Sequence, residues 1–333
     1  MGQIDILSVG DVVTDAFIKL LDDQAKVVND DRGSKWLAMP FATKLPFDHV
    51  EVAQAVGNAS NAAVSFARLG LNAGFVTNVG GDSEGRDIIN ALHHNGVDTR
   101  FVRINPSHKS NYHYVLWYKD ERTILIKHEE YDYHWSHLRP NEIPRWIYFS
   151  SISEHAIDYH DQVSDWLDDN PSVRMAFQPG TFQMKAGTER LKRIYQRTEV
   201  LILNREEAVF VSGGAYDDIE DLFKRLHALG PKVVIITDGP AGAYASDGEH
   251  RFSMPLYPDP APPLERTGAG DAFASTLVAA LVKGLSLEEA LAWAPINSMN
   301  VVQHVGAQAG LLTEKKLLEW LHHAPRDYHV KPM

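Results

Sequence analysis

Short apolar runs alternate with helical segments along most of the chain, and no other feature limits the fold as strongly. Each run typical of a buried strand has a helical pattern before or after it. The strands are expected at 4–9, 73–79, 146–149, 173–177, 200–203 and 233–237, and the clearest helices at 60–69 and 84–95. Strands joined in this way form a mostly parallel sheet that helices cover on both faces. We therefore expect a three-layer α/β fold, in which ligands bind at the carboxyl ends of the strands.

Two segments, at about 34–56 and 101–128, interrupt this alternation. Both are rich in aromatic and β-branched residues, and the second holds a hairpin pattern: Tyr112–Tyr118, a turn at 119–122, and Thr123–Ile126. We interpret the two insertions as a small β lid over the site of a single domain that spans 1–333. The alternative is that they add a pair of edge strands to the main sheet.

Composition excludes several kinds of site. The chain carries a formal net charge of −12 and no Lys/Arg run longer than Lys315–Lys316, so it lacks the basic surface of a nucleic-acid-binding protein. Without cysteine it has no disulfide, thiolate metal site or cysteine nucleophile. No apolar run approaches the ~18 residues of a membrane span, and the N-terminus lacks the pattern of a signal peptide. We expect a cytoplasmic protein without nucleic-acid or membrane partners.

The sharpest motif is Thr267-Gly268-Ala269-Gly270-Asp271, which opens directly into an apolar, Ala-rich helical segment at 272–280. Small residues let the backbone approach a ligand, and the free amides at a helix start form an anion hole. The positive end of the helix dipole favours an ionised Asp271, which is then able to accept a proton. The alternative is that Asp271 only caps the helix.

Three other loops carry polar groups at turns or strand ends. Thr237–Gly242 follows an apolar strand and suits nucleotide phosphates, although it also fits a hairpin turn. Asn204–Glu207 offers a carboxylate for a hydrated magnesium ion, although the same spacing fits a capping box. Gly57–Asn61 places asparagines on the first turn of a helix, where they either bind sugar hydroxyls or cap.

These motifs, in this order and together with Gly10–Asp15 after the first strand, resemble the PfkB family of carbohydrate and nucleoside kinases, which includes ribokinase, fructokinases and adenosine kinase. The resemblance runs from Ile6 to about Leu312 and is carried by 57–85, 264–277 and 298–310. It implies a ribokinase-like fold and an ATP-dependent kinase that uses Mg²⁺.

The resemblance also implies a role for each matching position. Asp271 matches the catalytic base, and Gly268, Ala269 and Gly270 match the anion hole. Positions that hold substrate hydroxyls match Asp15, Gly57 and Asn61. The nucleotide side matches Asn204, Thr237, Gly239 and Gly242, and Glu207 matches a residue tied to magnesium, which it would hold through water. The implied reaction transfers the γ-phosphoryl group of ATP to a primary hydroxyl of a sugar.

Several points stay open in the sequence. Glu265 stands where the family usually has an aspartate that helps to bind potassium, which leaves a monovalent-cation site at Glu265 undecided. A nucleoside is the alternative to a sugar substrate, because Tyr112, His113, Tyr114 and Trp117 could stack on a base. The same aromatic residues also fit a core of the lid itself or a homodimer contact between two lids. A non-catalytic sugar or nucleotide sensor is a further alternative, but a sensor has no need of Asp271.

Overall fold

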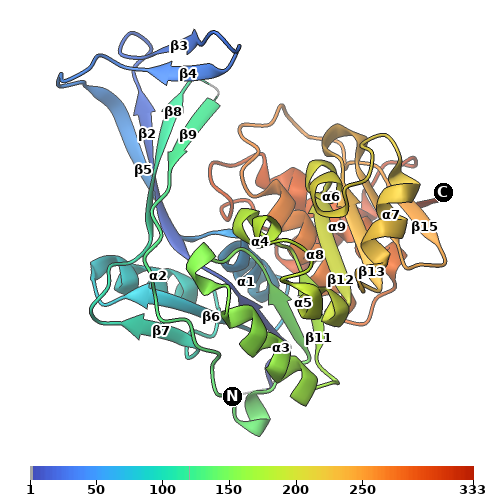
Figure 1. The fold of residues 1–333 in the computed structure, drawn as a ribbon. Helices are drawn as coiled ribbons and strands as arrows, with labels where there is room; N and C mark the ends of the chain where they lie inside the picture. The colour runs from blue at the N-terminus through green and yellow to red at the C-terminus, as the bar shows by residue number, and fades with distance from the viewer. Residues whose placement is uncertain (1–2, 120) are drawn as a thin grey trace.

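The computed structural model describes residues 3–119 and 121–333, and its centre is a ten-stranded sheet with the order β16-β15-β14-β13-β12-β11-β10-β1-β6-β7 (Figure 1). Neighbouring strands are parallel from β7 to β13 and antiparallel from β13 to β16. The bounds are β1 Ile6–Val9, β6 Ala73–Gly80, β7 Val102–Asn105, β10 Trp146–Phe149, β11 Arg174–Phe177, β12 Val200–Asn204, β13 Val233–Thr237, β14 Ala243–Ser246, β15 Arg251–Met254 and β16 Lys331–Pro332.

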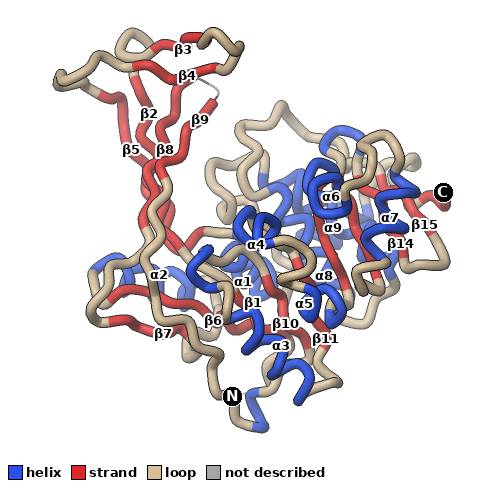
Figure 2. Tube along the Cα trace, viewed as in Figure 1, coloured by secondary structure: helices blue, strands red, loops and turns tan. Residues whose placement is uncertain are grey.

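Helices cover both faces of this sheet, as expected (Figure 2). Ile6 and Leu7, which are neighbours in β1, are buried in different clusters, because successive strand side chains point to opposite faces. The first face packs against α1, α8, α9 and α10, and the second against α3, α5, α6 and α7. The helices are α1 Asn58–Arg68, α2 Ser83–His94, α3 Tyr159–Asp169, α4 Thr181–Ala186, α5 Lys192–Arg197, α6 Arg205–Ser212, α7 Ile219–His227, α8 Ala269–Val282, α9 Leu287–Val301 and α10 Glu314–His322. The three-layer α/β fold is therefore confirmed.

Helix α8 is the buried element that positions the Gly-rich motif. Almost all of its residues are buried, and it packs against α1 and α9. An Ala-rich helix without a polar face suits this place, because it can be covered on every side. Asp271, in the first turn of α8, is also buried, next to the start of α1.

A second sheet, which we call the projecting sheet, extends away from the main body and has the order β5-β2-β8-β9 (Figure 1). Its strands are β2 Val13–Leu20, β5 Phe47–Val56, β8 Tyr112–Tyr118 and β9 Glu121–Leu125, and the hairpin of β3 (Lys26–Asn29) and β4 (Lys35–Ala38) lies at its far end. The predicted hairpin forms, with Tyr118 opposite Glu121. Its turn is tighter than 119–122, and Asp120 lies outside the described residues.

The bounds of the projecting sheet differ from the expected insertions at 34–56 and 101–128. β2 belongs to it, because β2 pairs in parallel with β8, a long-range pairing that no local pattern reveals. β7 instead extends the main sheet beside β6. The alternative of extra edge strands therefore holds for β7 and is wrong for β8 and β9, which pair within the projecting sheet.

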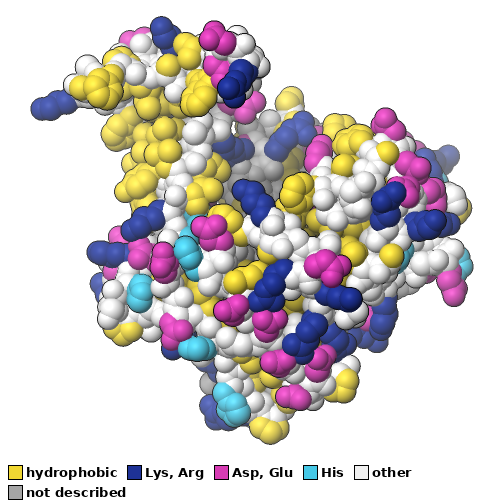
Figure 3. Space-filling view, in the orientation of Figure 1, with side chains coloured by type: hydrophobic (Ala, Val, Ile, Leu, Met, Phe, Trp, Pro, Cys, Tyr) yellow, Lys and Arg dark blue, Asp and Glu magenta, His cyan; other side chains and the backbone are white. Residues whose placement is uncertain are grey.

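The two faces of the projecting sheet have different neighbours. His113, Val115 and Trp117 share the inner face with Asp15 and Arg122, their cross-strand partners. The outer face leaves large apolar side chains in solvent (Figure 3): Val50 is 48% exposed, Val52 53%, Tyr114 49% and Leu125 51%. Tyr112 and Tyr114 lie together on this outer face, with ring centroids 5.1 Å apart.

Candidate active site

The carboxylate of Asp271 is held by amide groups from α1 and from the residue after β11. Asn58 Nδ2 donates to Oδ1 at 3.0 Å, Asn61 Nδ2 donates to Oδ2 at 2.8 Å, and Gln178 Nε2 donates to Oδ1 at 3.4 Å. The N-cap of α8 is Gly268, and no side chain caps this helix. The alternative that Asp271 is only a helix cap is therefore wrong.

Burial raises the pKa of Asp271 above its ordinary value, while the hydrogen bonds from Asn61, Gln178 and Asn58 oppose the shift. The expected effect of the helix dipole is thus outweighed by desolvation. A raised pKa makes the carboxylate a stronger base, and the amide donors keep its charged form hydrogen-bonded. This combination suits a group that takes up a proton during a reaction.

The amide donors are themselves held in place. The Tyr148 hydroxyl donates to Gln178 Oε1, and Gln308 Nε2 donates to Asn61 Oδ1 at 3.0 Å. The expected contact of Asn61 with a substrate hydroxyl stays a prediction, and the structure adds that its amide already joins Asp271 to Gln308. No sequence motif indicated Gln178. Its place directly after β11 nevertheless agrees with the rule that ligands bind at the carboxyl ends of parallel strands.

Position 268 requires glycine for two reasons. Its φ of +78° lies in the left-handed region, and a Cβ there would lie 2.4 Å from the Cβ of Ala307. The next two residues, Ala269 and Gly270, begin α8, where backbone amides lack partners within the helix. The Ala269 amide donates to the carbonyl of Arg266 at 3.4 Å. A Cβ at Gly270 would meet nothing within 4 Å, so the helix start faces open space. An anion hole at this motif stays a prediction, which the open space at the helix start supports.

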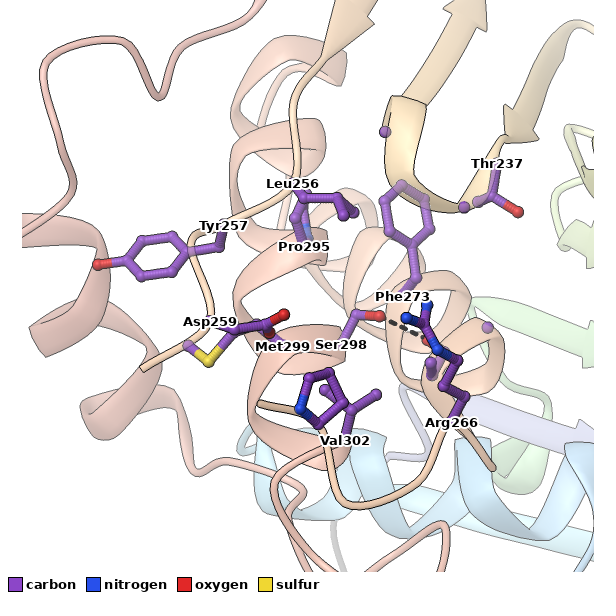
Figure 4. A pocket seen from close by; sticks show the side chains of 15 residues that line it. Thr237, Leu256, Tyr257, Asp259, Arg266, Phe273, Pro295, Ser298, Met299 and Val302 are labelled. Atoms are coloured by element: carbon purple, nitrogen blue, oxygen red, sulfur yellow. Dashed lines mark hydrogen bonds between the residues drawn. The ribbon is translucent and has the colours of Figure 1, made fainter. Parts of the chain in front are cut away.

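A pocket lies in front of this helix start, and Figure 4 shows its lining. It brings together Thr237, Gly239 and Gly242 from the β13 loop with Ala269 and Gly270. Ser298 fixes the helix start by donating to the carbonyl of Ala269 at 2.9 Å. The rest of the lining is mainly apolar and suits a flat base: Leu256, Tyr257, Pro263, Phe273, Pro295, Met299 and Val302, with Asp259 and Arg266 as charged members.

Asn204 and Glu207 form the capping box that the spacing indicated. Asn204 Oδ1 accepts from the Glu207 amide at 2.8 Å, and Glu207 Oε2 accepts from the Asn204 amide at 2.9 Å. Burial raises the pKa of Glu207; the Asn204 hydrogen bond lowers it, and the charge of Asp271 raises it further. The capping alternative is therefore confirmed, and the role of Glu207 toward magnesium stays a prediction.

The donor set fits a magnesium ion that is held mostly by water and phosphate. Among the described residues, no group of three or more His, Asp or Glu side chains could form a protein-only metal site. Mg²⁺ commonly keeps several waters and uses one or two carboxylates together with substrate phosphates. Glu207 Oε1 fits the role of such a carboxylate, acting through a water molecule.

The other end of the site lies at the base of the projecting sheet. Asp15 Oδ1 is 3.3 Å from His113 Nδ1, and Asp11 Oδ2 is 3.5 Å from His128 Nδ1. The two histidine rings are 5.3 Å apart, and Phe182 lies 6.0 Å from His128. Gly57, with a φ of +114°, brings its backbone close to the carbonyl of Asp11 and starts the helix that carries Asn58 and Asn61. His128 and Phe182 were not predicted from the sequence, because nothing local connects them to Asp15.

Glu265 is fully paired within the protein. Its Oε2 is 2.9 Å from Arg122 Nη1, and its Oε1 accepts from the Gly306 amide at 2.5 Å. The positive charge beside the Glu265 carboxylate is the guanidinium group of Arg122, which lies on β9. The described residues therefore do not fit a monovalent cation at Glu265.

A mostly parallel sheet, a buried carboxylate and a Gly-rich helix start in front of a pocket are features typical of the class of small-molecule kinases. Residues 51–314 match the family described as pfkB family carbohydrate kinase, and the chain belongs to that family. It is a phosphotransferase with an alcohol group as acceptor, of the kind that includes sugar and nucleoside kinases. Among the described residues, no helix is long and apolar enough to span a bilayer.

Individual relatives differ in their acceptors. The ATP-dependent 6-phosphofructokinase of Thermoanaerobacterium thermosaccharolyticum is 26% identical over 75% of this chain and 80% of its own length. The ribokinase of Bacillus subtilis is 28% identical over 80% of this chain and 87% of its own. The crystal structure of the Methanocaldococcus jannaschii nucleoside kinase, an archaeal member of the ribokinase family, has a TM-score of 0.75 and 19% identity over 97% of this chain and all of that one. The last likeness shows a ribokinase-like fold.

Proposed function

We propose that this protein transfers the γ-phosphoryl group of ATP to a primary hydroxyl of a sugar, with Asp271 as the general base. The observation that carries the proposal is the position of Asp271. It is buried and held by Asn58, Asn61 and Gln178, and it lies one residue after the amides that line the pocket. A base and an anion hole on the same helix turn are the parts that phosphoryl transfer needs.

The reaction follows from this geometry. Asp271 takes the proton of the acceptor hydroxyl as that oxygen bonds to the γ-phosphorus, and the bond to the β–γ bridging oxygen breaks to release ADP. The amides of Gly268 to Asp271 receive the negative charge on the transferred group. Glu207 would hold Mg²⁺ through water, and the ion would neutralise the β- and γ-phosphates when bound. The projecting sheet acts as a lid that keeps water from the site.

Charge at the acceptor end favours an uncharged substrate. The carboxylates of Asp11 and Asp15 both lie at this end, each beside a histidine side chain, His128 and His113 respectively. A sugar phosphate would meet repulsion there. Among the described residues, Asp15 Oδ1, His113 Nε2 and His128 Nδ1 are buried without a hydrogen-bond partner. Buried polar atoms of this kind are satisfied by the hydroxyls of a polyol.

A nucleoside is the second candidate acceptor, and the grouped rings favour it. His113, His128 and Phe182 offer ring faces and edges at the acceptor end. Tyr112 and Tyr114 do not add to this group, because they lie on the outer face. With Val50 and Val52 they form the surface that we assign to a lid–lid homodimer.

The acceptor class is tested by thermal shift and turnover on one panel. We expect an unphosphorylated sugar to raise the Tm and to release ADP from MgATP, and fructose 6-phosphate to do neither. A nucleoside that stabilises more than every free sugar at equal concentration would transfer the assignment to the second candidate. Stabilisation by sugars without ADP release from any acceptor would favour the sensor instead.

Asp15→Ala tests the contact of one residue with the acceptor on the same panel. Loss of a buried hydrogen-bond partner costs about 1–3 kcal/mol, so the acceptor KM should rise roughly 5- to 150-fold while MgATP still raises the Tm. An unchanged acceptor KM would show that Asp15 does not bind the acceptor.

Potassium should have little influence on the rate. Both oxygens of Glu265 are engaged by Arg122 and Gly306, so its charge is already compensated. We expect kcat to change less than about twofold when KCl is replaced by tetramethylammonium chloride at equal ionic strength, because the Glu265 carboxylate is already paired with Arg122. A tenfold loss of kcat on this exchange would contradict the expectation.

A further inference from the structure

Arg122 connects the projecting sheet to the segment that leads into the anion hole. It lies on β9, on the inner face opposite Trp117, and pairs with Glu265 at 2.9 Å. Among residues 3–119 and 121–333, this is the one ion pair that joins the strands of the projecting sheet to the chain after residue 140. The Arg122 and Glu265 side chains are only 28% and 16% exposed, so solvent screens the pair less than a surface contact.

Glu265 transmits this contact to the catalytic turn. Its Oε1 accepts from the Gly306 amide, and the neighbouring Leu264 amide donates to the carbonyl of Val302 at 2.8 Å. Three residues further on, Gly268 packs so tightly on Ala307 that no Cβ fits between them. The segment 264–268 is therefore clamped against 302–307 on one side and bound by Arg122 on the other.

We infer that Arg122 is a positioning residue for phosphoryl transfer, which acts through Glu265 on the amides of Gly268 to Asp271. In this arrangement the anion hole has its working geometry when the projecting sheet is docked and Arg122 holds Glu265. The positive charge that holds Glu265 is thus the guanidinium group of Arg122, which belongs to the projecting sheet. Docking of the projecting sheet and alignment of the anion-hole amides therefore occur together. The inference rests on the proposed function, because it assigns a role in that reaction.

Loss of the positive charge of Arg122 should therefore lower kcat. Removing a contact that aligns anion-hole donors costs about tenfold or more in rate, so Arg122→Ala should lower kcat at least to that extent. The Kd of MgATP should change by less than about threefold, because the nucleotide pocket does not include Arg122. Arg122→Lys keeps the charge without the planar fork and should fall between Arg122→Ala and the unchanged protein.

A charge-exchanged pair separates positioning from general stability. Arg122→Glu and Glu265→Arg should each lose turnover, and the double variant should recover at least part of it. Guanidinium chloride at millimolar concentration should partly restore Arg122→Ala. Arg193→Ala is the matched control: it removes an ion pair between α5 and α3, at 2.7 Å from Asp168, and should leave kcat unchanged.

A kcat for Arg122→Ala within twofold of the unchanged protein would overturn the inference, and so would a loss of Tm without a loss of kcat per folded molecule. Failure of the proposed function has a different signature, because the unchanged protein would then show no turnover with any acceptor.

Discussion

Asp271→Asn should fold, bind MgATP and turn over about 10²–10⁴ times more slowly, the usual scale for the loss of a general base. Asparagine keeps the shape of the side chain, and its carbonyl oxygen can still accept one of the amide bonds from Asn58 or Asn61. It cannot take up the proton of the acceptor hydroxyl. Steady-state kcat and the Tm shift with MgATP measure the two halves of this expectation.

The pH profile gives an independent check. Because burial raises the pKa of Asp271, the folded protein binds that proton more tightly than the unfolded chain does. The group therefore favours the fold at low pH and loses this contribution as pH rises through the raised pKa, so removing the charge should not unfold the protein at neutral pH. The acid limb of kcat should begin above the ordinary range of an aspartate and be absent in Asp271→Asn.

Asp218→Asn is the matched control for this substitution. Asp218 caps α7 by accepting from the Asp221 amide at 2.9 Å, and asparagine serves equally well as an N-cap. Its turnover should equal that of the unchanged protein. Near-normal turnover in Asp271→Asn would refute the assignment of the base.

Gly268→Ala should lower kcat by about 10²–10³, the scale for losing a donor of an oxyanion hole. The new Cβ would lie 2.4 Å from the Cβ and 2.6 Å from the Cα of Ala307, so the turn has to move away from 307. That movement displaces the amides of Ala269 and Gly270 from the pocket. Single-turnover kinetics at saturating MgATP would isolate the chemical step.

Two companion variants separate collision from backbone strain. Gly284 has a similar φ of +87°, and a Cβ there meets nothing within 4 Å, so Gly284→Ala should cost about 1 kcal/mol of stability and no turnover. Gly268→Ala combined with Ala307→Gly removes the nearest clash and should regain part of the rate. Equal rates in the single and double variants would show that the collision with the Ala307 Cβ is not the cause of the loss, since the Ala307 Cα at 2.6 Å remains in both.

Local patterns predicted most of the main sheet. The strands expected at 146–149 and 233–237 have those bounds in the structure, and the helix expected at 60–69 is Asn58–Arg68. The alternation of short apolar runs with helical segments is a local signal, so it can be recognised without knowledge of the tertiary structure. The place of Thr237, Gly239 and Gly242 at the end of a strand followed in the same way, and their contact with a nucleotide stays a prediction.

What the sequence could not predict depends on long-range contacts. Asn61 and Asp271 are separated by 210 positions, and nothing near Asn61 indicates that its amide holds a carboxylate. Arg122 and Glu265 are 143 positions apart, and neither belongs to a motif for the other. The membership of β2 in the projecting sheet has the same cause, since seven further elements separate β2 from its partner β8 in the sequence.

The strand order of the main sheet also bears on how the chain folds as it is synthesised. After β6 has paired with one edge of β1 and β7 with β6, the sheet grows from the other edge of β1, from β10 to β16 in sequence order, so each new strand meets a neighbour that is already present. Helix α8, which covers α1, emerges late. Until then the buried face of α1, with Asn61 and Ser65, has no cover from the catalytic helix. A nascent chain that has not reached α8 therefore exposes this face of α1 as an apolar surface with unpaired amides, and exposed surface of this kind makes a ribosome-bound chain prone to aggregation.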